Sequence, residues 1–150
     1  MNRLNRKVEY ALMALKVMAS KHQSELTSAK EVVEKTGCPF DATARVMQQM
    51  AQKEILRSEH GAHGGYILIR DLNKISFFDL NEIVLGPIAL AKCLHGEERC
   101  DLVDTCNIMS PVNMLSKKLS EFYQNLSVGE LLRVRAPSLQ SSQAGSEATP

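Results

Sequence analysis

The 150-residue sequence contains no tryptophan, and aromatic residues make up only 5% of it. It has no apolar run long enough to cross a membrane, and its first seven residues lack the apolar block of a secretory signal. We therefore expect a cytoplasmic protein with no membrane partner. Hydrophobic residues at 44% and charged residues at 23% exclude disorder across the whole chain, and the length suits one small domain with an appendage.

The sequence also has almost no net charge, at +1, but this value results from cancellation. Residues 1–70 hold 11 Lys and Arg against 7 Asp and Glu, whereas residues 71–106 hold 3 against 7. A basic half followed by an acidic segment indicates an anionic partner for the first part and a different role for the second.

The N-terminal half has the pattern of three helices. Apolar residues at steps of three and four predict an amphipathic helix over residues 3–21. A capping box formed by Ser28 and Glu31 begins a second, short helix that Gly37 ends, and a third helix follows over residues 40–53. Its inner stripe consists of Thr43, Val46, Met47 and Met50. Two helices joined by a tight glycine-containing turn are typical of a helix-turn-helix.

A β-hairpin follows these helices. Residues 55–59 and 66–70 read as strands, and the glycine-rich residues 60–65 between them read as the hairpin tip. Helix, helix-turn-helix and hairpin together predict a winged helix, so we expect a mainly α fold with a small β-hairpin wing. We assign residues 1–80 to this winged helix-turn-helix domain, whose expected partner is DNA.

The C-terminal half is expected to hold a loop, a long helix and a tail. Residues 81–108 contain a helix end and a loop with three cysteines, and residues 109–132 form a dimerisation helix with Ser110 as N-cap and Pro111 at the first position. Its coiled-coil seam, spaced in steps of four and three, consists of Ile108, Val112, Leu115, Leu119, Phe122 and Leu126. The seam predicts a homodimer. Residues 133–150 have too little apolar content to fold and are predicted to be a disordered tail.

The outer face of the helix over residues 40–53 carries side chains that can read DNA bases. Arg and Gln each form two hydrogen bonds to base edges in the major groove, and Ala contacts the thymine methyl group. Arg45 and Gln48 lie opposite the buried stripe, and the further candidates Ala42 and Gln49 lie on the flanks of this face. The alternative interpretation is a solvated helix face.

The hairpin tip and the N-terminus offer further DNA contacts. Glycines let a backbone approach a DNA strand closely, and basic side chains reach phosphates or a narrow minor groove. The wing candidates are Arg57, His60, Gly61, His63, Gly64 and Gly65, and the N-terminal candidates are Arg3, Arg6 and Lys7. The glycines also serve as turn residues, and the terminal side chains could simply be solvated.

Three cysteines, Cys93, Cys100 and Cys106, are the sharpest chemical feature of the chain. In a reducing cytosol, clustered cysteines indicate metal or redox chemistry more than a structural disulfide. Zinc sites normally use closer pairs, so these spacings suit a larger group such as an iron–sulfur cluster, 4Fe-4S or 2Fe-2S. Three thiolates leave one iron for another ligand. Cys38 is expected to be a small core residue instead.

Two other functions remain open at this point. One is a zinc-bound or metal-free winged-helix regulator that senses oxidants directly through its cysteine thiols. The other is a thiol enzyme, which requires a base beside its nucleophile, and the only nearby histidine is His95. Nothing positive supports the enzyme, so we expect a protein that is not one.

Four stretches of the chain, in this order, resemble the Rrf2-type family of bacterial iron–sulfur winged-helix transcription regulators. They are residues 4–12, 61–68, 75–80 and 93–106, and the similarity covers about residues 2–132. The resemblance implies a homodimeric repressor that binds a pseudo-palindromic double-stranded DNA operator. It further implies that nitric oxide, redox state or iron changes DNA affinity through the cluster.

The resemblance also implies a set of cluster ligands. Cys93, Cys100 and Cys106 match the three cluster cysteines of the family. Some members use a histidine three residues after the last cysteine as fourth ligand, but this chain has Met109 there. In other members an acidic residue from the first helix of the partner subunit takes that role. Glu9 stands at the matching position, so the resemblance implies Glu9 as the fourth ligand.

Overall fold

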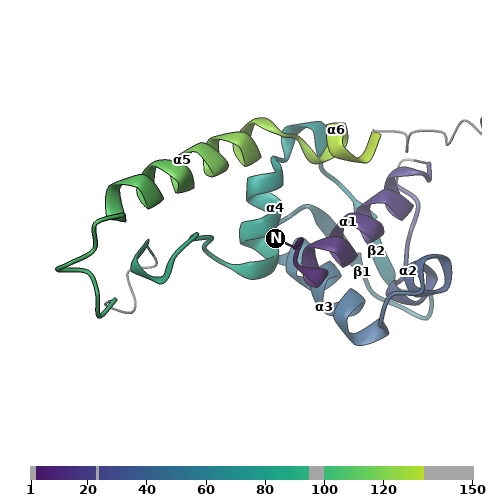
Figure 1. Cartoon of the computed structure of the whole chain (residues 1–150). Coiled ribbons are helices and arrows are strands. Elements are labelled where there is room, and N and C mark those ends of the chain that lie inside the picture. Colours follow the sequence, from purple (N-terminus) through teal and green to yellow (C-terminus); the bar gives the residue numbers. More distant parts are fainter. Residues whose placement is uncertain (1–2, 23, 95–99, 134–150) are drawn as a thin grey trace, which may run out of the picture.

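The computed structural model describes residues 3–22, 24–94 and 100–133, so most of the predicted tail lies outside the described residues. The elements in order are α1 (Arg6–Ala19), α2 (Ala29–Thr36), α3 (Phe40–Gln52), β1 (Leu56–Glu59), β2 (Gly65–Leu68), the 3-10 turn η1 (Leu72–Lys74), α4 (Phe77–Leu85), the 3-10 turn η2 (Lys92–Leu94), α5 (Met109–Asn125) and α6 (Val128–Arg133). Helices α1 to α4 and the hairpin form a body, from which α5 extends as an arm (Figure 1). Helix α6 returns to the body.

Local caps set the ends of the first helices. The Asn5 side chain accepts a hydrogen bond from the backbone N–H of Lys7 at the start of α1. Helix α1 covers Arg6–Ala19 and is therefore shorter than the predicted helix over residues 3–21. Ser28 caps α2 as expected, and Gly37 ends it with φ 74°, a left-handed conformation that glycine adopts without strain. The predicted capping box is only half formed, because the Glu31 carboxylate turns to two lysines instead.

The helix-turn-helix is confirmed by the burial of its predicted stripe. Thr43, Val46, Met47 and Met50 of α3 are all buried, and they join a core to which α1 contributes a matching face. That face of α1 consists of Val8, Ala11, Ala14, Leu15 and Met18. The apolar residues that recur with the helical period in α1 and in α3 therefore pack into the same core.

The wing is an antiparallel pair of strands with a third segment at its edge. The register pairs Leu56 with Leu68 and Glu59 with Gly65. Thr27, from the segment before α2, bridges Tyr66 of β2 through two backbone hydrogen bonds of 2.9 Å each. A Cβ atom on Gly65 would lie 2.8 Å from the Thr27 carbonyl oxygen, so this close approach requires glycine.

The arm begins and ends differently from the sequence prediction. Helix α5 starts at Met109 with no side-chain cap, so the predicted N-cap at Ser110 is wrong. Pro111 sits in the first turn, where backbone N–H groups have no helical partner and proline is tolerated. The helix ends because the Leu126 carbonyl accepts a hydrogen bond from the Phe77 N–H at 2.7 Å, and the unpredicted α6 then packs against η1 and α1.

Helix α4 connects the arm with the body. Ser76 and Asp79 form a complete capping box at its start. Its buried side chains pack against α1 and α3, and the Phe77 ring meets Tyr123 of α5 edge-on at a centroid distance of 5.0 Å. Within the described part of the chain, no helix is long and apolar enough to cross a membrane.

An ion-pair network at the start of α2 generates the first prediction. Two lysine ammonium groups, Lys21 and then Lys35, hydrogen-bond the Glu31 carboxylate at 2.7 and 2.8 Å and lower its pKa. A lowered folded-state pKa stabilises the fold above the unfolded-state pKa of about 4.3, and this stabilisation is lost as pH falls through the folded-state value.

We expect Glu31→Gln to lower the free energy of unfolding at neutral pH and to weaken its decline in acid, as measured by urea unfolding across a pH series. Glu34→Gln is the matched control, because its carboxylate is 64% exposed and lies 3.9 Å from Lys30. If the free energy of unfolding fell equally with pH in acid for wild type and Glu31→Gln, the result would contradict the role of this network.

Candidate functional site

The outer face of α3 presents two of the predicted base-reading side chains. Arg45 and Gln48 are exposed, and Ala42 is half-buried between them and the core. No hydrogen bond or ion pair restrains the Arg45 guanidinium among the residues that the structure describes. A free guanidinium beside a free amide on one helix face is the arrangement that bidentate base contacts require.

Gln49 lies apart from this reading face. Its side-chain amide nitrogen donates to the backbone carbonyl of Val84 in α4 at 3.4 Å, and its side-chain oxygen is buried without a partner in the described structure. The expectation placed Gln49 on the flank of the DNA-facing side, whereas the structure directs it into the contact between α3 and α4. The flank of α3 is covered by a helix that follows much later in the chain.

An exposed aromatic side chain at the start of α3 was missed by sequence reasoning. Phe40 is the first residue of the helix, and 53% of it is exposed. Helical phasing places Phe40 on the side of the buried stripe, seven residues before Met47, so the sequence pattern carried no signal for its exposure. The neighbouring Cys38 is buried, as expected, with its sulfur 3.2 Å from that of Met13.

At the wing, the tip is exposed and the base of β2 is not. His60, Gly61 and His63 are exposed, whereas Gly64 and Gly65 are half-buried. Arg57 on β1 is held by the Glu59 carboxylate at 2.9 Å, with more than half of its side chain exposed. The tip can therefore approach a partner without rearrangement, whereas Arg57 must first break its ion pair with the Glu59 carboxylate.

The N-terminal candidates also divide into free and paired side chains. The Arg3 and Lys7 side chains are exposed and form no hydrogen bond or ion pair with another residue that the structure describes. Arg6 forms an ion pair with Glu9, one helical turn later, at 2.9 Å. The Glu9 side chain is 28% exposed, so it reaches the surface while Arg6 occupies one of its oxygens.

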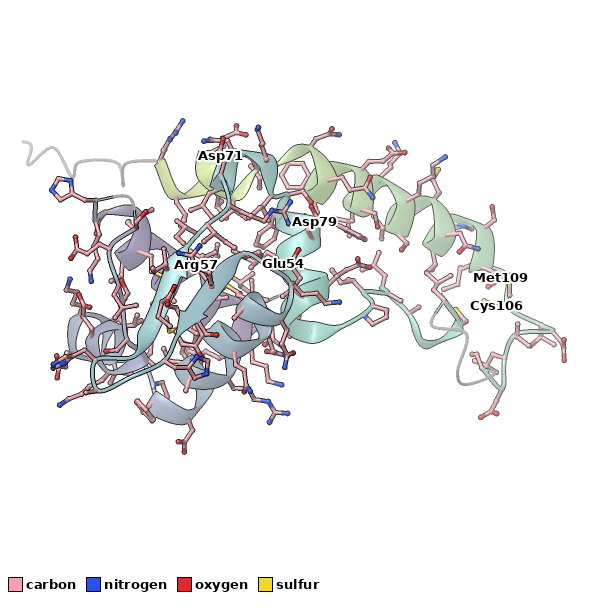
Figure 2. The ribbon with its side chains drawn as sticks, turned by 180° about the vertical axis from the view of Figure 1, so that it is seen from behind. Glu54, Arg57, Asp71, Asp79, Cys106 and Met109 are labelled. Carbon is pink, nitrogen blue, oxygen red and sulfur yellow. The ribbon has the colours of Figure 1, made fainter. Side chains whose placement is uncertain are left out.

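The three clustered cysteines lie on the segment that joins α4 to α5, well away from the wing. Cys93, Cys100 and Cys106 are half-buried free thiols, and Figure 2 shows Cys106 at the end of the arm that is far from Arg57. Among the described residues, no three His, Cys, Asp or Glu side chains are grouped closely enough to hold a metal ion. The donor chemistry, three accessible thiols on one segment, still fits an iron–sulfur cluster.

Helix α5 has an apolar surface that the rest of the described chain leaves uncovered. None of its residues is buried. Every second member of the predicted seam, Ile108, Leu115 and Phe122, is 53 to 61% exposed, and these three recur at intervals of seven. An apolar row of this kind on a 17-residue helix is the geometry of one strand of a coiled coil.

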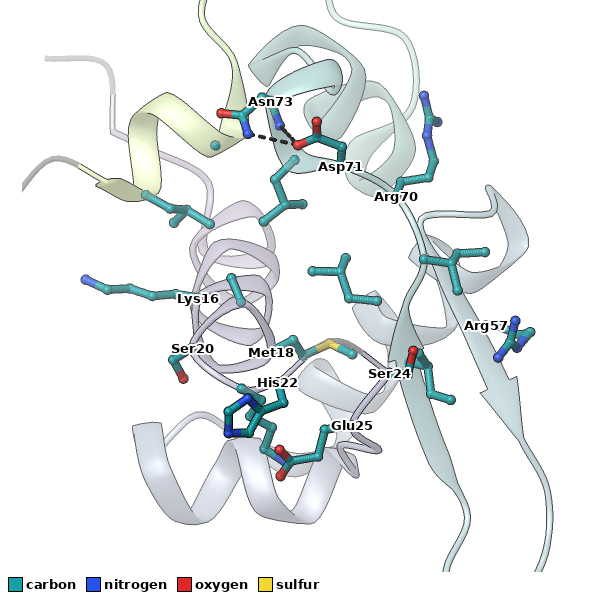
Figure 3. A pocket seen from close by; sticks show the side chains of 18 of the residues that line it. Lys16, Met18, Ser20, His22, Ser24, Glu25, Arg57, Arg70, Asp71 and Asn73 are labelled. Carbon is teal, nitrogen blue, oxygen red and sulfur yellow. Dashed lines mark hydrogen bonds and ion pairs between the residues drawn. The ribbon is translucent and has the colours of Figure 1, made fainter.

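A cleft of about 950 Å³ opens between the end of α1, β2, η1 and α6. Met18 lies within this ring of elements, and Asp71 at its edge is bonded to Asn73 (Figure 3). Its described lining includes no cysteine, so the cleft is separate from the thiol segment.

Comparison with known proteins places these features in one family. A family model described as Rrf2, iron-dependent transcriptional regulator, matches residues 4–134. The HTH-type transcriptional regulator IscR of Sodalis glossinidius is 27% identical over 130 residues, covering 87% of this chain and 78% of its own. Protein aau3 of Rhizobium meliloti is 24% identical over 134 residues, covering 89% of this chain and 86% of its own.

Solved structures agree on the fold. CymR, described as the global cysteine regulator of B. subtilis, superimposes with a TM-score of 0.66 at 20% identity, over 88% of this chain and 97% of its own. IscR of T. potens gives a TM-score of 0.59 at 20% identity, over 87% and 86%. The predicted winged-helix fold is thereby confirmed.

Proposed function

The chain belongs to the Rrf2 family of transcriptional regulators, and from this premise we propose that it is a homodimeric repressor whose DNA affinity depends on an iron–sulfur cluster. The observation that carries the proposal is the set of three free thiols on the segment between α4 and α5, remote from the free Arg45 on α3. In this proposal residues 1–80 bind DNA, residues 81–108 hold the cluster, and residues 109–132 dimerise through α5, since α6 packs on the body.

In this proposal α3 is the recognition helix and enters the major groove of double-stranded DNA. Arg45 and Gln48 read base edges, and Ala42 contacts a thymine methyl group. Two copies related by a two-fold axis then read the half-sites of a pseudo-palindromic operator. Gln49 is not included, because its amide is already engaged with α4.

In this proposal the wing contacts the minor groove and the N-terminus contacts the phosphates of the DNA backbone. The exposed tip, with His60, Gly61 and His63, reaches the minor groove, and Gly64 and Gly65 shape the strand behind it. Arg3 and Lys7 bind phosphates directly. Arg6 and Arg57 join them only after leaving their carboxylates, which exposed ion pairs do at little cost.

The proposed dimer uses α5. A second copy of the helix would cover the row of Ile108, Leu115 and Phe122, which otherwise remains in water. Antiparallel or parallel pairing of two such rows buries the same seam in both subunits, as a two-fold interface requires.

For the cluster, we propose Cys93, Cys100 and Cys106 as the thiolate ligands and Glu9 of the second copy as the fourth. When bound, the cluster supplies an iron site that reacts with nitric oxide or oxygen, or that is lost under iron scarcity. A Glu9 carboxylate engaged there gives up its ion pair with Arg6. The Arg6 guanidinium then becomes available for a DNA phosphate, which links the ligand set to the DNA face.

A second candidate is a regulator that senses oxidants directly, with zinc or no metal. The observation that favours it is that the described residues form no preassembled group of metal ligands, while three thiols remain free and accessible. Sulfenic acid or disulfide formation at these thiols would then alter the arm.

The recognition helix is tested with a duplex that the wild-type protein selects from a random-sequence pool. We expect Arg45→Ala to weaken binding by about 1–3 kcal/mol and to relax the base preference at one position of each half-site. Arg6→Ala should weaken binding to all sequences alike and reduce the salt dependence. Fluorescence anisotropy over a salt series measures both, and unchanged specificity in Arg45→Ala would show that the helix docks differently.

The cluster is tested by anaerobic purification. The wild type should be brown and contain iron and acid-labile sulfide in comparable amounts, and replacement of Cys93, Cys100 and Cys106 by Ala should remove both. Cys38→Ala is the control and should retain them, because Cys38 is buried in the body. A colourless protein with stoichiometric zinc would favour the second candidate, and an unchanged DNA response in the triple variant would exclude both.

The dimer is tested at the seam. Leu115→Glu places a charge in the centre of the exposed row, and we expect it to shift sedimentation from dimer to monomer. Asn113→Glu, at an exposed position outside the row, should leave the dimer intact. Equal sedimentation of all three proteins would show that α5 is not the interface.

A further inference from the structure

Gln49 joins two elements that the proposed function treats separately. It sits on the recognition helix between the exposed Gln48 and the buried Met50, and its amide crosses to α4 to reach the Val84 carbonyl. The orientation of the amide is determined chemically, because its oxygen in that place would face another acceptor. The side chain is therefore a polar link between α3 and α4.

Val84 lies in the part of α4 that adjoins the cysteine segment. It is in the last turn, where carbonyl groups lack helical partners, and α4 ends at Leu85. Gly86, with φ 85°, and Pro87 then turn the chain into the segment that carries Cys93. A change in the path of that segment reaches the end of α4 before any other element of the body.

The hydrogen-bonding groups of the Gln49 side-chain amide are not all paired in this conformation. The nitrogen-to-oxygen distance of 3.4 Å is long for a hydrogen bond, and the Gln49 oxygen is buried with no partner in the described structure. A buried acceptor without a donor is costly, so a rearrangement of this contact that gives the Gln49 oxygen a donor would be favoured. A second arrangement, in which this oxygen is paired, would make the contact a two-state element of the kind that couples distant sites.

We propose that Gln49 is a positioning residue that transmits the state of the cysteine segment to the recognition helix. When the Val84 carbonyl moves, the Gln49 amide that is hydrogen-bonded to it moves as well. This movement changes the orientation of Arg45 and Gln48 in the major groove. The inference rests on the proposed DNA-binding function but requires no particular cluster. Because coupling is reciprocal, bound DNA must also change the environment of the cysteines.

The test uses this reciprocity in metal-free, reduced full-length protein. Alkylation of Cys93, Cys100 and Cys106 by iodoacetamide is followed by mass spectrometry, without DNA and with a saturating amount of the selected duplex. In wild type we expect bound DNA to change the alkylation rate of Cys93 about 5-fold or more. In Gln49→Met, which keeps the length of the side chain but not its amide, we expect the two rates to become nearly equal.

Gln52→Met is the matched control, at an exposed position of α3 that the proposal does not use. It should keep the wild-type ratio of alkylation rates, and saturation with DNA removes any difference in affinity. Thermal unfolding checks that the variants fold, and Gln49→Leu replaces Gln49→Met if methionine is not accommodated.

The outcomes separate the inference from the proposed function. A folded Gln49 variant with the wild-type ratio would overturn the role of Gln49. A wild type that binds the duplex without any change in cysteine alkylation would overturn the coupling and leave DNA binding intact. Failure to select any duplex would overturn the DNA-binding proposal and, with it, the inference.

Discussion

The packing of α4 is the constraint on which the rest of the structure depends. Phe77, Leu80 and Val84 are buried, and they hold the helix against α1 and α3 on one side while Phe77 meets Tyr123 of α5 on the other. The start of α4 is tied to the end of α5 by the hydrogen bond from the Phe77 N–H to the Leu126 carbonyl, and its end leads into the cysteine segment. Both ends of the segment that carries the thiols are therefore anchored on one nine-residue helix, which packs against α3.

The sequence predicted those elements whose burial follows a local period. The stripe from Thr43 to Met50 is correct because four side chains on one helix face share one core. Gly37 is correct because a helix end needs a left-handed residue there. The errors come from partners distant in the chain: Lys21 draws Glu31 out of its capping box, and the pairing of Phe77 with Leu126 ends α5 and makes room for α6. No local pattern contains that information.

The candidate site shows the same division. Helical phasing placed Arg45 and Gln48 on the exposed side, where the structure has them, but it could not tell which flank of α3 would be covered by α4. Gln49 and Arg45 are only four positions apart, and one is engaged with α4 while the other is free. Similarly, the spacing of the cysteines favoured an iron–sulfur cluster over zinc as a sequence prediction, but whether the three thiols meet depends on tertiary contacts that no spacing contains. Gly65 was assigned to DNA approach, and its close contact with Thr27 shows a structural requirement for glycine.

Charge on the basic half of the chain is less available than the sequence implies. Arg6 and Arg57 each hold a carboxylate at 2.9 Å, so part of the positive charge is neutralised within the protein. These are exposed pairs, worth about 0–1 kcal/mol each, and a phosphate can replace the carboxylate with little loss.

In the proposed complex with DNA, such replacement would free the carboxylates of Glu9 and Glu59 near the DNA, where their negative charges would oppose binding unless they acquire other partners. Among the residues that the structure describes, Arg57 is the only cation paired with Glu59 on the wing. Glu9 is different, because a metal ligand role would give its charge a partner at the moment that Arg6 leaves. The two arginines are thus electrostatically similar in the isolated chain, and under the proposed ligand set only the one on α1 would link DNA affinity to the occupancy of the cysteine segment.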